Sequence, residues 1–171
     1  MIRGFEVFGP KPKNHITIHD LHPNGVEMKI YLDNCCYGRP YDDQTQVRIS
    51  LEAQSKLAIQ QLVAEGHLKL AASFLNVYEN EGRKDENAKK HIAEFIHDNV
   101  IDYVDESEKE AMQPLVDEIA STGVKPIDAT HVAAAIRCRC DYFITTDDRI
   151  LKYRTDRIKI VNPAQFMTIE R

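Results

Sequence analysis

The sequence lacks any long apolar run, because no stretch approaches the roughly 18 to 20 apolar residues that a membrane-spanning helix needs. Its N-terminus also lacks the apolar core of a secretory signal peptide. Positive charge is not in excess either: 22 Lys and Arg residues stand against 27 Asp and Glu residues, for a net charge of −5. These absences argue against a membrane protein and against a broadly basic coat for nucleic acid. They predict a cytoplasmic protein, and 171 residues suffice for one buried core.

Zinc-type cysteine spacing is absent as well. The four cysteines form an adjacent pair, Cys35 and Cys36, and an alternate pair, Cys138 and Cys140. Neither pair has the C-x-x-C spacing of a structural zinc site. We therefore predict that all four are small, reduced, buried side chains.

Residues 1–27 lack sustained helical or strand periodicity and are rich in proline and glycine. They also hold His15, His19 and His22, which would suit metal binding, but a flexible leader is the preferred interpretation. Its origin stays open between an over-extended reading frame, a vector remnant and a genuine appendage. Because a clear strand begins at Met28, residues 28–171 are predicted to form a single domain.

From Met28 onward, short β-prone apolar runs alternate with segments of helical pattern. We expect strands at 28–32, 67–72, 100–104, 141–146 and 157–161, and helices at 43–64, 84–98 and 105–120 and from Ser73 and Lys125. In the first helix, an apolar stripe is expected to face the core: Val47, Leu51, Leu57, Ile59, Leu62 and Val63. The alternation predicts an α/β fold, a three-layer α/β/α sandwich with a mainly parallel central sheet.

Acidic side chains stand where the strands end or helices begin. Asp33 follows the first strand, Asp147 and Asp148 follow the fourth, Asp128 lies in an early helical turn, and Glu79 lies in the helix that Ser73 caps. Because the carboxyl ends of parallel strands meet at one edge of a sheet, we expect these side chains to share a crevice. Gathered carboxylates repel one another, which implies a hard divalent cation. Each acid alone is explained as well by a helix cap, a turn or a solvated surface.

Four segments, in this order, carry a resemblance to a known family: Tyr31–Asn34, Ser73–Glu79, Pro126–Ala135 and Phe143–Asp147. From Met28 to about Phe166 the sequence resembles the PIN-domain ribonucleases, including the VapC-like toxins of toxin–antitoxin pairs. The resemblance implies a PIN-like fold and divalent-metal-dependent cleavage of an RNA substrate. It also allows for a cognate antitoxin protein and a homodimer. The sequence departs from the family at Cys35 and Cys36, which replace the small hydroxyl residues common after the first acid.

The resemblance and the ligand chemistry together suggest roles for the acids. Hard carboxylate oxygens select Mg²⁺ or Mn²⁺. We expect Asp33 and Asp128 to bind the ion directly, and Glu79 and Asp147 to act through water or to hold a second ion. Asp148, beside Asp147, leaves the fourth ligand ambiguous. The acidic net charge does not exclude a nuclease, because bound metal neutralises an acidic site locally.

Neighbouring polar residues are given supporting roles. Asn34, Thr145 and Thr146 are candidates for orienting the carboxylates. The candidates for holding flanking phosphates are Arg39, Arg149, Lys152 and Arg154. His131 is expected to be packed or hydrogen-bonded rather than to act as a catalytic base.

Two other enzyme classes fit the motifs less well. A phosphoacceptor receiver domain needs adjacent acids after its first strand, and a haloacid-dehalogenase-type phosphatase needs D-x-D there, whereas this chain has Asp33-Asn34-Cys35. The stronger alternative is a catalytically silent PIN-like scaffold that binds RNA or a protein partner.

Overall fold

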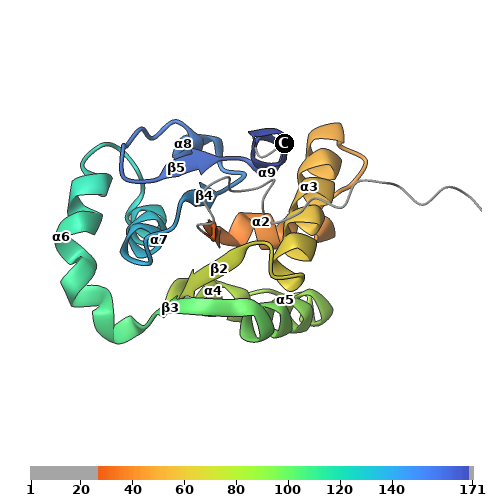
Figure 1. The fold of residues 1–171 in the computed structure, drawn as a ribbon, viewed down its shortest axis with the longest axis horizontal. Coiled ribbons are helices and arrows are strands. Elements are labelled where there is room, and N and C mark those ends of the chain that lie inside the picture. The colour runs from red at the N-terminus through yellow and green to blue at the C-terminus, as the bar shows by residue number, and fades with distance from the viewer. Residues whose placement is uncertain (1–26, 170–171) are drawn as a thin grey trace, which may run out of the picture.

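The computed structural model describes residues 27–169, so nearly all of the predicted leader lies outside the described residues. Within that range, five strands form a fully parallel sheet (Figure 1): β1 (Lys29–Leu32), β2 (Lys69–Ser73), β3 (Val100–Val104), β4 (Tyr142–Ile144) and β5 (Lys159–Val161). Their order across the sheet is β3-β2-β1-β4-β5. Because β1 is central, the residue that follows it lies in the middle of the sheet's carboxyl edge.

The longer helices follow the strands in the order that the sequence predicts, whereas the short α2 and α8 and the two 3-10 helices were not predicted. In chain order the helices are α2 (Asn34–Gly38), the 3-10 helix η1 (Arg39–Tyr41), α3 (Val47–Ala64), α4 (Phe74–Glu81), α5 (Glu86–Asn99), the 3-10 helix η2 (Glu106–Glu108), α6 (Lys109–Ala120), α7 (Pro126–Arg137), α8 (Asp148–Leu151) and α9 (Pro163–Ile169). Pro114 lies inside α6, which continues past it. None of the helices between residues 27 and 169 has the length and apolar character to cross a membrane.

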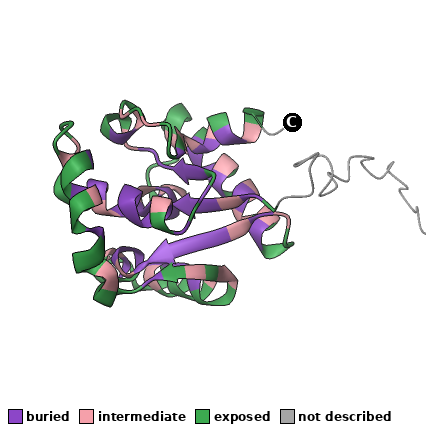
Figure 2. Ribbon diagram, turned by 60° about the vertical axis from the view of Figure 1, so that its left-hand side comes forward, coloured by how far each residue is buried: buried purple, intermediate pink, exposed green. Residues whose placement is uncertain are grey.

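The strands bury side chains on both faces, as expected for a parallel sheet between two helical layers. Tyr31 of β1 and Phe143 of β4 belong to a core cluster with residues of α6 and α7. Ile30 and Leu32 of β1 belong to a second cluster, with residues of α2, α3, α5 and α9. Figure 2 shows largely buried strands between helices whose outer faces are exposed. The predicted three-layer α/β/α sandwich is therefore confirmed.

The α3 helix differs from its prediction in two respects. It begins at Val47 rather than Asp43, because the preceding residues form a turn in which Asp43 accepts hydrogen bonds from the backbone N–H and hydroxyl of Thr45. The predicted apolar stripe is wrong at Val47, Leu51 and Leu57, which are 75%, 54% and 51% exposed.

Charged side chains fill part of the buried side of α3 instead. Glu52 and Lys56 are 3% and 2% exposed. The Glu52 carboxylate accepts hydrogen bonds from Arg39 Nε at 2.6 Å and from Arg48 Nε at 2.8 Å. The Lys56 ammonium lies 5.5 Å from the centroid of the Tyr37 ring. Ion pairs of Glu52 and a cation–π contact of Lys56 thus stabilise these buried charges, at positions where hydrophobic patterning predicts apolar residues.

Candidate functional site

The predicted acids lie at the carboxyl edge of the sheet, beside a topological switch point. From β1 the chain proceeds to β2 and β3 on one side, and later forms β4 and β5 on the other. In parallel sheets the crevice between two such strands is where ligands bind. Asp33 follows β1 directly, and its backbone N–H donates to the carbonyl oxygen of Ile144 in β4 at 2.9 Å. Asp147 lies just beyond the end of β4.

Asp33 is buried, and both of its carboxylate oxygens accept hydrogen bonds. Oδ1 accepts from the backbone N–H of Asn34 at 2.7 Å. Oδ2 accepts from the Thr145 hydroxyl at 2.7 Å and from the Cys35 thiol at 3.2 Å. The backbone of Asn34 and the hydroxyl of Thr145 therefore orient this carboxylate, and the contact of Thr145 is the one that the sequence predicts. Thr146 acts indirectly, because its backbone N–H donates to the Cys35 sulfur at 3.3 Å.

The cysteines divide into three buried thiols and one at the site. Cys36, Cys138 and Cys140 are free and buried, as predicted, and burial raises the pKa of Cys138 to about 12. Cys35 is free but only partly buried, so the prediction of burial is wrong for this residue. Its contact with Asp33 was not foreseen, since it depends on how α2 turns back over the end of β4.

Asp128 lies in the first turn of α7, which begins at Pro126 as predicted. Burial raises the pKa of its carboxyl group above the usual value, and the charges of Asp33 and Asp147 raise it further. His131 and Arg149 oppose this effect without cancelling it. Asp33 and Asp147 therefore lie close enough to Asp128 for their charges to disfavour its ionisation, whereas the hydrogen bond and charge of Arg149 lower the pKa of Asp147.

Glu79 projects from α4 toward the buried His131 of α7. The His131 Nε2 atom lies 3.0 Å from Glu79 Oε1, and its Nδ1 atom lies 2.7 Å from the Tyr31 hydroxyl. That hydroxyl in turn lies 2.7 Å from the Ser73 hydroxyl at the start of α4. A chain of buried hydrogen bonds thus connects Glu79 to β1 and to the beginning of its own helix. His131 is packed and hydrogen-bonded, as predicted.

The ionisation of this pair reflects two opposing effects. Burial disfavours the charged form of Glu79, but the hydrogen bond and positive charge of His131 outweigh it, so the pKa of Glu79 is lowered. Burial likewise disfavours charged His131, yet the hydrogen bond to Glu79 and the charges of Glu79, Asp33 and Asp128 raise its pKa. The two side chains therefore stabilise each other's charged forms.

Asp147 and Asp148 face different neighbours. Asp147 caps α8 by accepting the backbone N–H of Arg149 at 2.8 Å, and its side chain is 23% exposed. The Asp148 side chain is 62% exposed and pairs with Arg48 of α3 at 2.7 Å. Because Asp147 interacts with Asp128 and Asp148 is directed to α3, the geometry favours Asp147 as the fourth acid of the site.

The donor atoms suit a hydrated hard cation rather than a closed metal cage. Among residues 27–169, no three or more His, Cys, Asp and Glu side chains are grouped so as to hold a metal ion together. Mg²⁺ commonly takes one or two protein carboxylates and keeps several waters. Asp33 and Asp128, a repelling pair at the switch point, fit that pattern.

The basic residues near the site are mostly engaged by carboxylates. Arg39 pairs with Glu52 and Asp42, and Arg149 pairs with Asp147. The other predicted phosphate contacts, Lys152 and Arg154, line a hollow of about 260 Å³ that also includes Arg149 and the α6–α7 connection. On the opposite side of the acids, Arg83 lines a cavity with Glu79 and Asn34. Sequence reasoning missed Arg83, which follows α4 and carries no motif.

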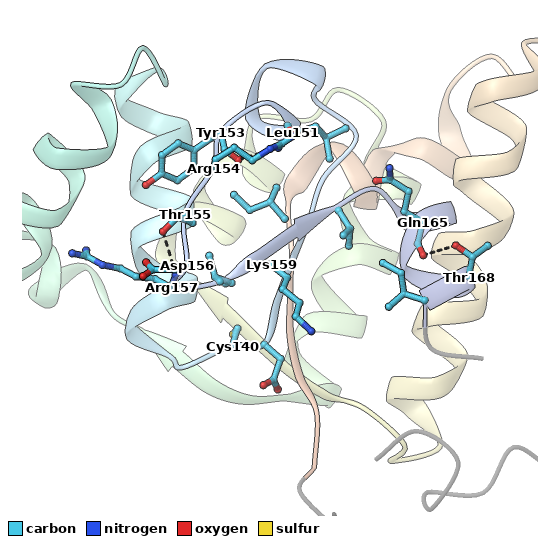
Figure 3. Close-up of a pocket in the computed structure, with 15 residues that line it drawn as sticks. Cys140, Leu151, Tyr153, Arg154, Thr155, Asp156, Arg157, Lys159, Gln165 and Thr168 are labelled. Atoms are coloured by element: carbon cyan, nitrogen blue, oxygen red, sulfur yellow. Dashed lines mark hydrogen bonds between the residues drawn. The ribbon is translucent and has the colours of Figure 1, made fainter. Parts of the chain in front are cut away.

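A larger cavity, of about 850 Å³, lies away from the acids along the outer side of β5 (Figure 3). Hydrogen bonds satisfy polar groups along its wall, such as that between the Thr168 hydroxyl and the Gln165 carbonyl oxygen and that between the Arg157 N–H and the Thr155 hydroxyl. No predicted site acid lines it. Size alone therefore does not locate the site in this protein.

No protein-family model matches the sequence, and no curated protein matches it either. Among solved structures, a chain from VapBC2 of Rickettsia felis, bound to a DNA fragment from their promoter, matches with a TM-score of 0.52. The two sequences are 14% identical, and the match covers 79% of this chain and 98% of that chain. At this identity the likeness establishes the fold. The chain therefore has the PIN-like α/β/α fold to which its four sequence segments point.

Proposed function

We propose that this protein is a divalent-metal-dependent endoribonuclease that hydrolyses RNA phosphodiester bonds. The observation that carries the proposal is the convergence of Asp33, Asp128 and Asp147 on the switch point of the sheet, where burial and then the charges of Asp33 and Asp147 raise the pKa of Asp128. Neighbouring carboxylates that are partly or fully buried are stabilised by a cation between them. The PIN-like fold and the order of the four sequence segments support the same function.

In this proposal the four acids bind metal in two different ways. Asp33 and Asp128 hold Mg²⁺ or Mn²⁺ directly, while Glu79 and Asp147 act through water or hold a second ion that arrives with RNA. The bound ion would lower the pKa of a water and offset charge on the phosphate. Asn34 and Thr145 keep the Asp33 carboxylate in one orientation, and His131 does the same for Glu79.

The comparison with solved structures also suggests binding partners to test for this chain. The matched chain comes from VapBC2, described with a DNA fragment from its promoter. We therefore propose a cognate antitoxin protein as a partner of this chain and a homodimer as an assembly to test. Co-expression with the protein encoded next to its gene, followed by size-exclusion chromatography, would measure both.

The central experiment is cleavage of a mixed RNA pool in Mg²⁺, in Mn²⁺ and in EDTA, with cut sites mapped by sequencing. We expect cleavage with either metal and none in EDTA. Cleavage that persists in EDTA would contradict the metal requirement. RNA binding without cleavage in any condition would favour the catalytically silent scaffold.

Cys35 provides a separate prediction about the site. We expect iodoacetamide to label Cys35 ahead of Cys36, Cys138 and Cys140, because alkylation needs an accessible sulfur and the other three cysteines are buried. The added group would displace Asp33 or Thr145, so cleavage should fall on the order of 100-fold, the usual scale for a misplacement of about 1 Å. Labelled peptides identified by mass spectrometry, together with residual activity, measure this.

The matched control is Cys35→Ser, which keeps a small hydroxyl donor for Asp33. We expect it to cleave RNA and to keep its activity after iodoacetamide treatment. Equal inactivation of Cys35→Ser and wild type would show that another group is responsible.

A further inference from the structure

A cavity of about 370 Å³ opens beside Glu79, between α2 and the end of α4. Its lining includes Asn34 and Cys35, the two residues that follow Asp33, and Arg83. The charge of Arg83 acts on Glu79 and helps to lower the pKa of that acid, after the larger effects of burial and of His131. The cavity therefore adjoins the acidic site through Glu79, and Arg83 places a positive charge in its lining.

Arg83 is held in one orientation by three neighbours. Its Nη2 atom donates to the carbonyl oxygen of Asn34 at 2.8 Å, and its Nε atom donates to Asn80 Oδ1 at 3.1 Å. The guanidinium also packs on Gly38, where a Cβ atom would lie 2.9 Å from Arg83 Nη1. The absence of a side chain at Gly38 is therefore what admits the guanidinium. Two of the five N–H donors of an arginine are used in this way, and the rest stay available to a ligand.

Arg83 differs from the other arginines near the acids because its hydrogen-bond acceptors are neutral groups rather than carboxylates. Arg39, Arg48 and Arg149 each form ion pairs with carboxylates. The hydrogen bonds of Arg83 end instead on neutral oxygens, and in residues 27–169 no carboxylate forms an ion pair with it. Its charge acts on Glu79, which lines the same cavity, but no carboxylate among the described residues holds the guanidinium in an ion pair.

The surroundings carry charge of both signs, because the carboxylates of Asp42 and Glu79 line the cavity together with Arg83. Lys56 lies buried nearby, and burial, with contributions that include the charge of Arg83, lowers its pKa to about 8. Asp42 also lines the cavity, but it pairs with Arg39 at 2.9 Å. A preoriented guanidinium without a carboxylate partner is suited to binding phosphate, which it can contact through two parallel N–H groups.

We propose that Arg83 binds the phosphate of the RNA nucleotide next to the scissile one, on the Glu79 side of the acids. This inference rests on the proposed function and extends it by assigning a substrate subsite. RNA would then cross the acids from the cavity of Arg83 toward the hollow of Lys152 and Arg154 on the other side.

The test is binding of a fluorescent single-stranded RNA oligonucleotide, measured by anisotropy in EDTA over a series of salt concentrations. For Arg83→Gln we expect roughly tenfold weaker binding and a slope of log affinity against log salt that is smaller by about 0.7, the loss of one phosphate contact to a single strand. With metal present, KM for RNA cleavage should rise while kcat stays within about twofold. The matched control is Arg157→Gln, since Arg157 is an arginine at β5 that pairs with Glu118. It should keep the wild-type affinity and slope.

A second variant distinguishes loss of the Arg83 contact from a general loss of folded structure. Gly38→Ala keeps every charge but forces the Arg83 guanidinium to move, so RNA binding should weaken while the melting temperature stays near wild type. Unchanged affinity and salt slope in Arg83→Gln, in a protein that cleaves RNA, would overturn this inference and leave the proposed function standing. A wild type that neither binds nor cleaves RNA would overturn both.

Discussion

Replacing Asp128 with Asn is expected to abolish RNA cleavage without weakening the fold. Asn keeps the size of the side chain but removes one of the charges that repel at the switch point. Metal affinity and turnover should fall together, with cleavage lower by on the order of 100-fold or more, because electrostatic stabilisation at a reacting phosphate is lost. Stability of the metal-free protein should hold or rise slightly, since the repulsion is relieved.

The pH dependence of that gain has a definite sign. The pKa of Asp128 is raised in the folded state, so its ionised form is disfavoured there relative to the unfolded chain. The destabilisation is therefore absent at low pH and develops as pH rises through the ordinary carboxyl range toward the folded pKa. The advantage of Asp128→Asn over wild type should grow from acid to neutral pH in EDTA.

Melting temperature with and without Mn²⁺, measured beside RNA cleavage, tests this prediction. Mn²⁺ should stabilise wild type clearly and Asp128→Asn little. Asp156→Asn, a change of an exposed acid at the far end of β5, serves as the control. It should shift stability by no more than a few tenths of a kcal/mol and leave cleavage intact. Near wild-type cleavage by Asp128→Asn, or equal stabilisation of both proteins by Mn²⁺, would contradict the assignment.

The second large effect is expected at His131. Changing it to Leu removes hydrogen bonds to Glu79 and to the Tyr31 hydroxyl in a buried site. A hydrogen bond to a charged group contributes about 1.5–3 kcal/mol, so the free energy of unfolding should fall by roughly 2 kcal/mol or more. Glu79 would also lose its fixed orientation, and cleavage should fall by about 10–100-fold, the usual cost of losing a group that positions a metal ligand.

The loss of stability in His131→Leu should be largest within a limited pH range. His131, with its raised pKa, contributes stability that is full below its ordinary pKa of 6.5 and is lost as pH rises through the folded value. Glu79, with its lowered pKa, contributes stability above its ordinary pKa of 4.5 and loses it as pH falls. The cost of His131→Leu should therefore be greatest between these two values.

Urea unfolding in EDTA across that pH range measures the effect. The control is His91→Leu, because His91 is an exposed histidine on α5. His131→Gln, which can still donate to Glu79, should recover part of the stability and the activity. A His131→Leu protein with a flat pH profile and wild-type stability would show that the buried hydrogen-bond chain contributes nothing measurable.

The parts of the site that the sequence predicts are those set by local patterning. Asp33 and Asp147 follow apolar strands, and a parallel sheet brings the carboxyl ends of its strands to one edge whatever the details of the helices. Asp128 follows Pro126, whose ring favours the first turn of a helix. These features depend on residues close in sequence, which explains why the fold class and the sheet were predicted correctly.

Features that depend on tertiary contacts were not predicted. The buried side of α3 holds Glu52 and Lys56 beside Ile59 and Val63, and the burial of these two charged residues depends on distant partners, so hydrophobic patterning was wrong for the first part of the helix. Arg83 and Cys35 meet the acids only through the path of α2 and the end of α4. The nearest sequence signal is Gly38, a residue without a side chain where another group must approach closely.

The all-parallel sheet makes the site a late product of folding. Its acids come from four separate segments between Asp33 and Asp147, and they meet only when β4 has paired with the central β1, more than a hundred residues away in sequence. Contacts of such separation form slowly. A chain still emerging from the ribosome that has not yet exposed β4 cannot assemble the acids, so the proposed cleavage would begin only after most of the chain has been synthesised. Under the proposed function, recovery of RNA cleavage after dilution from denaturant would therefore report the pairing of β4 with β1.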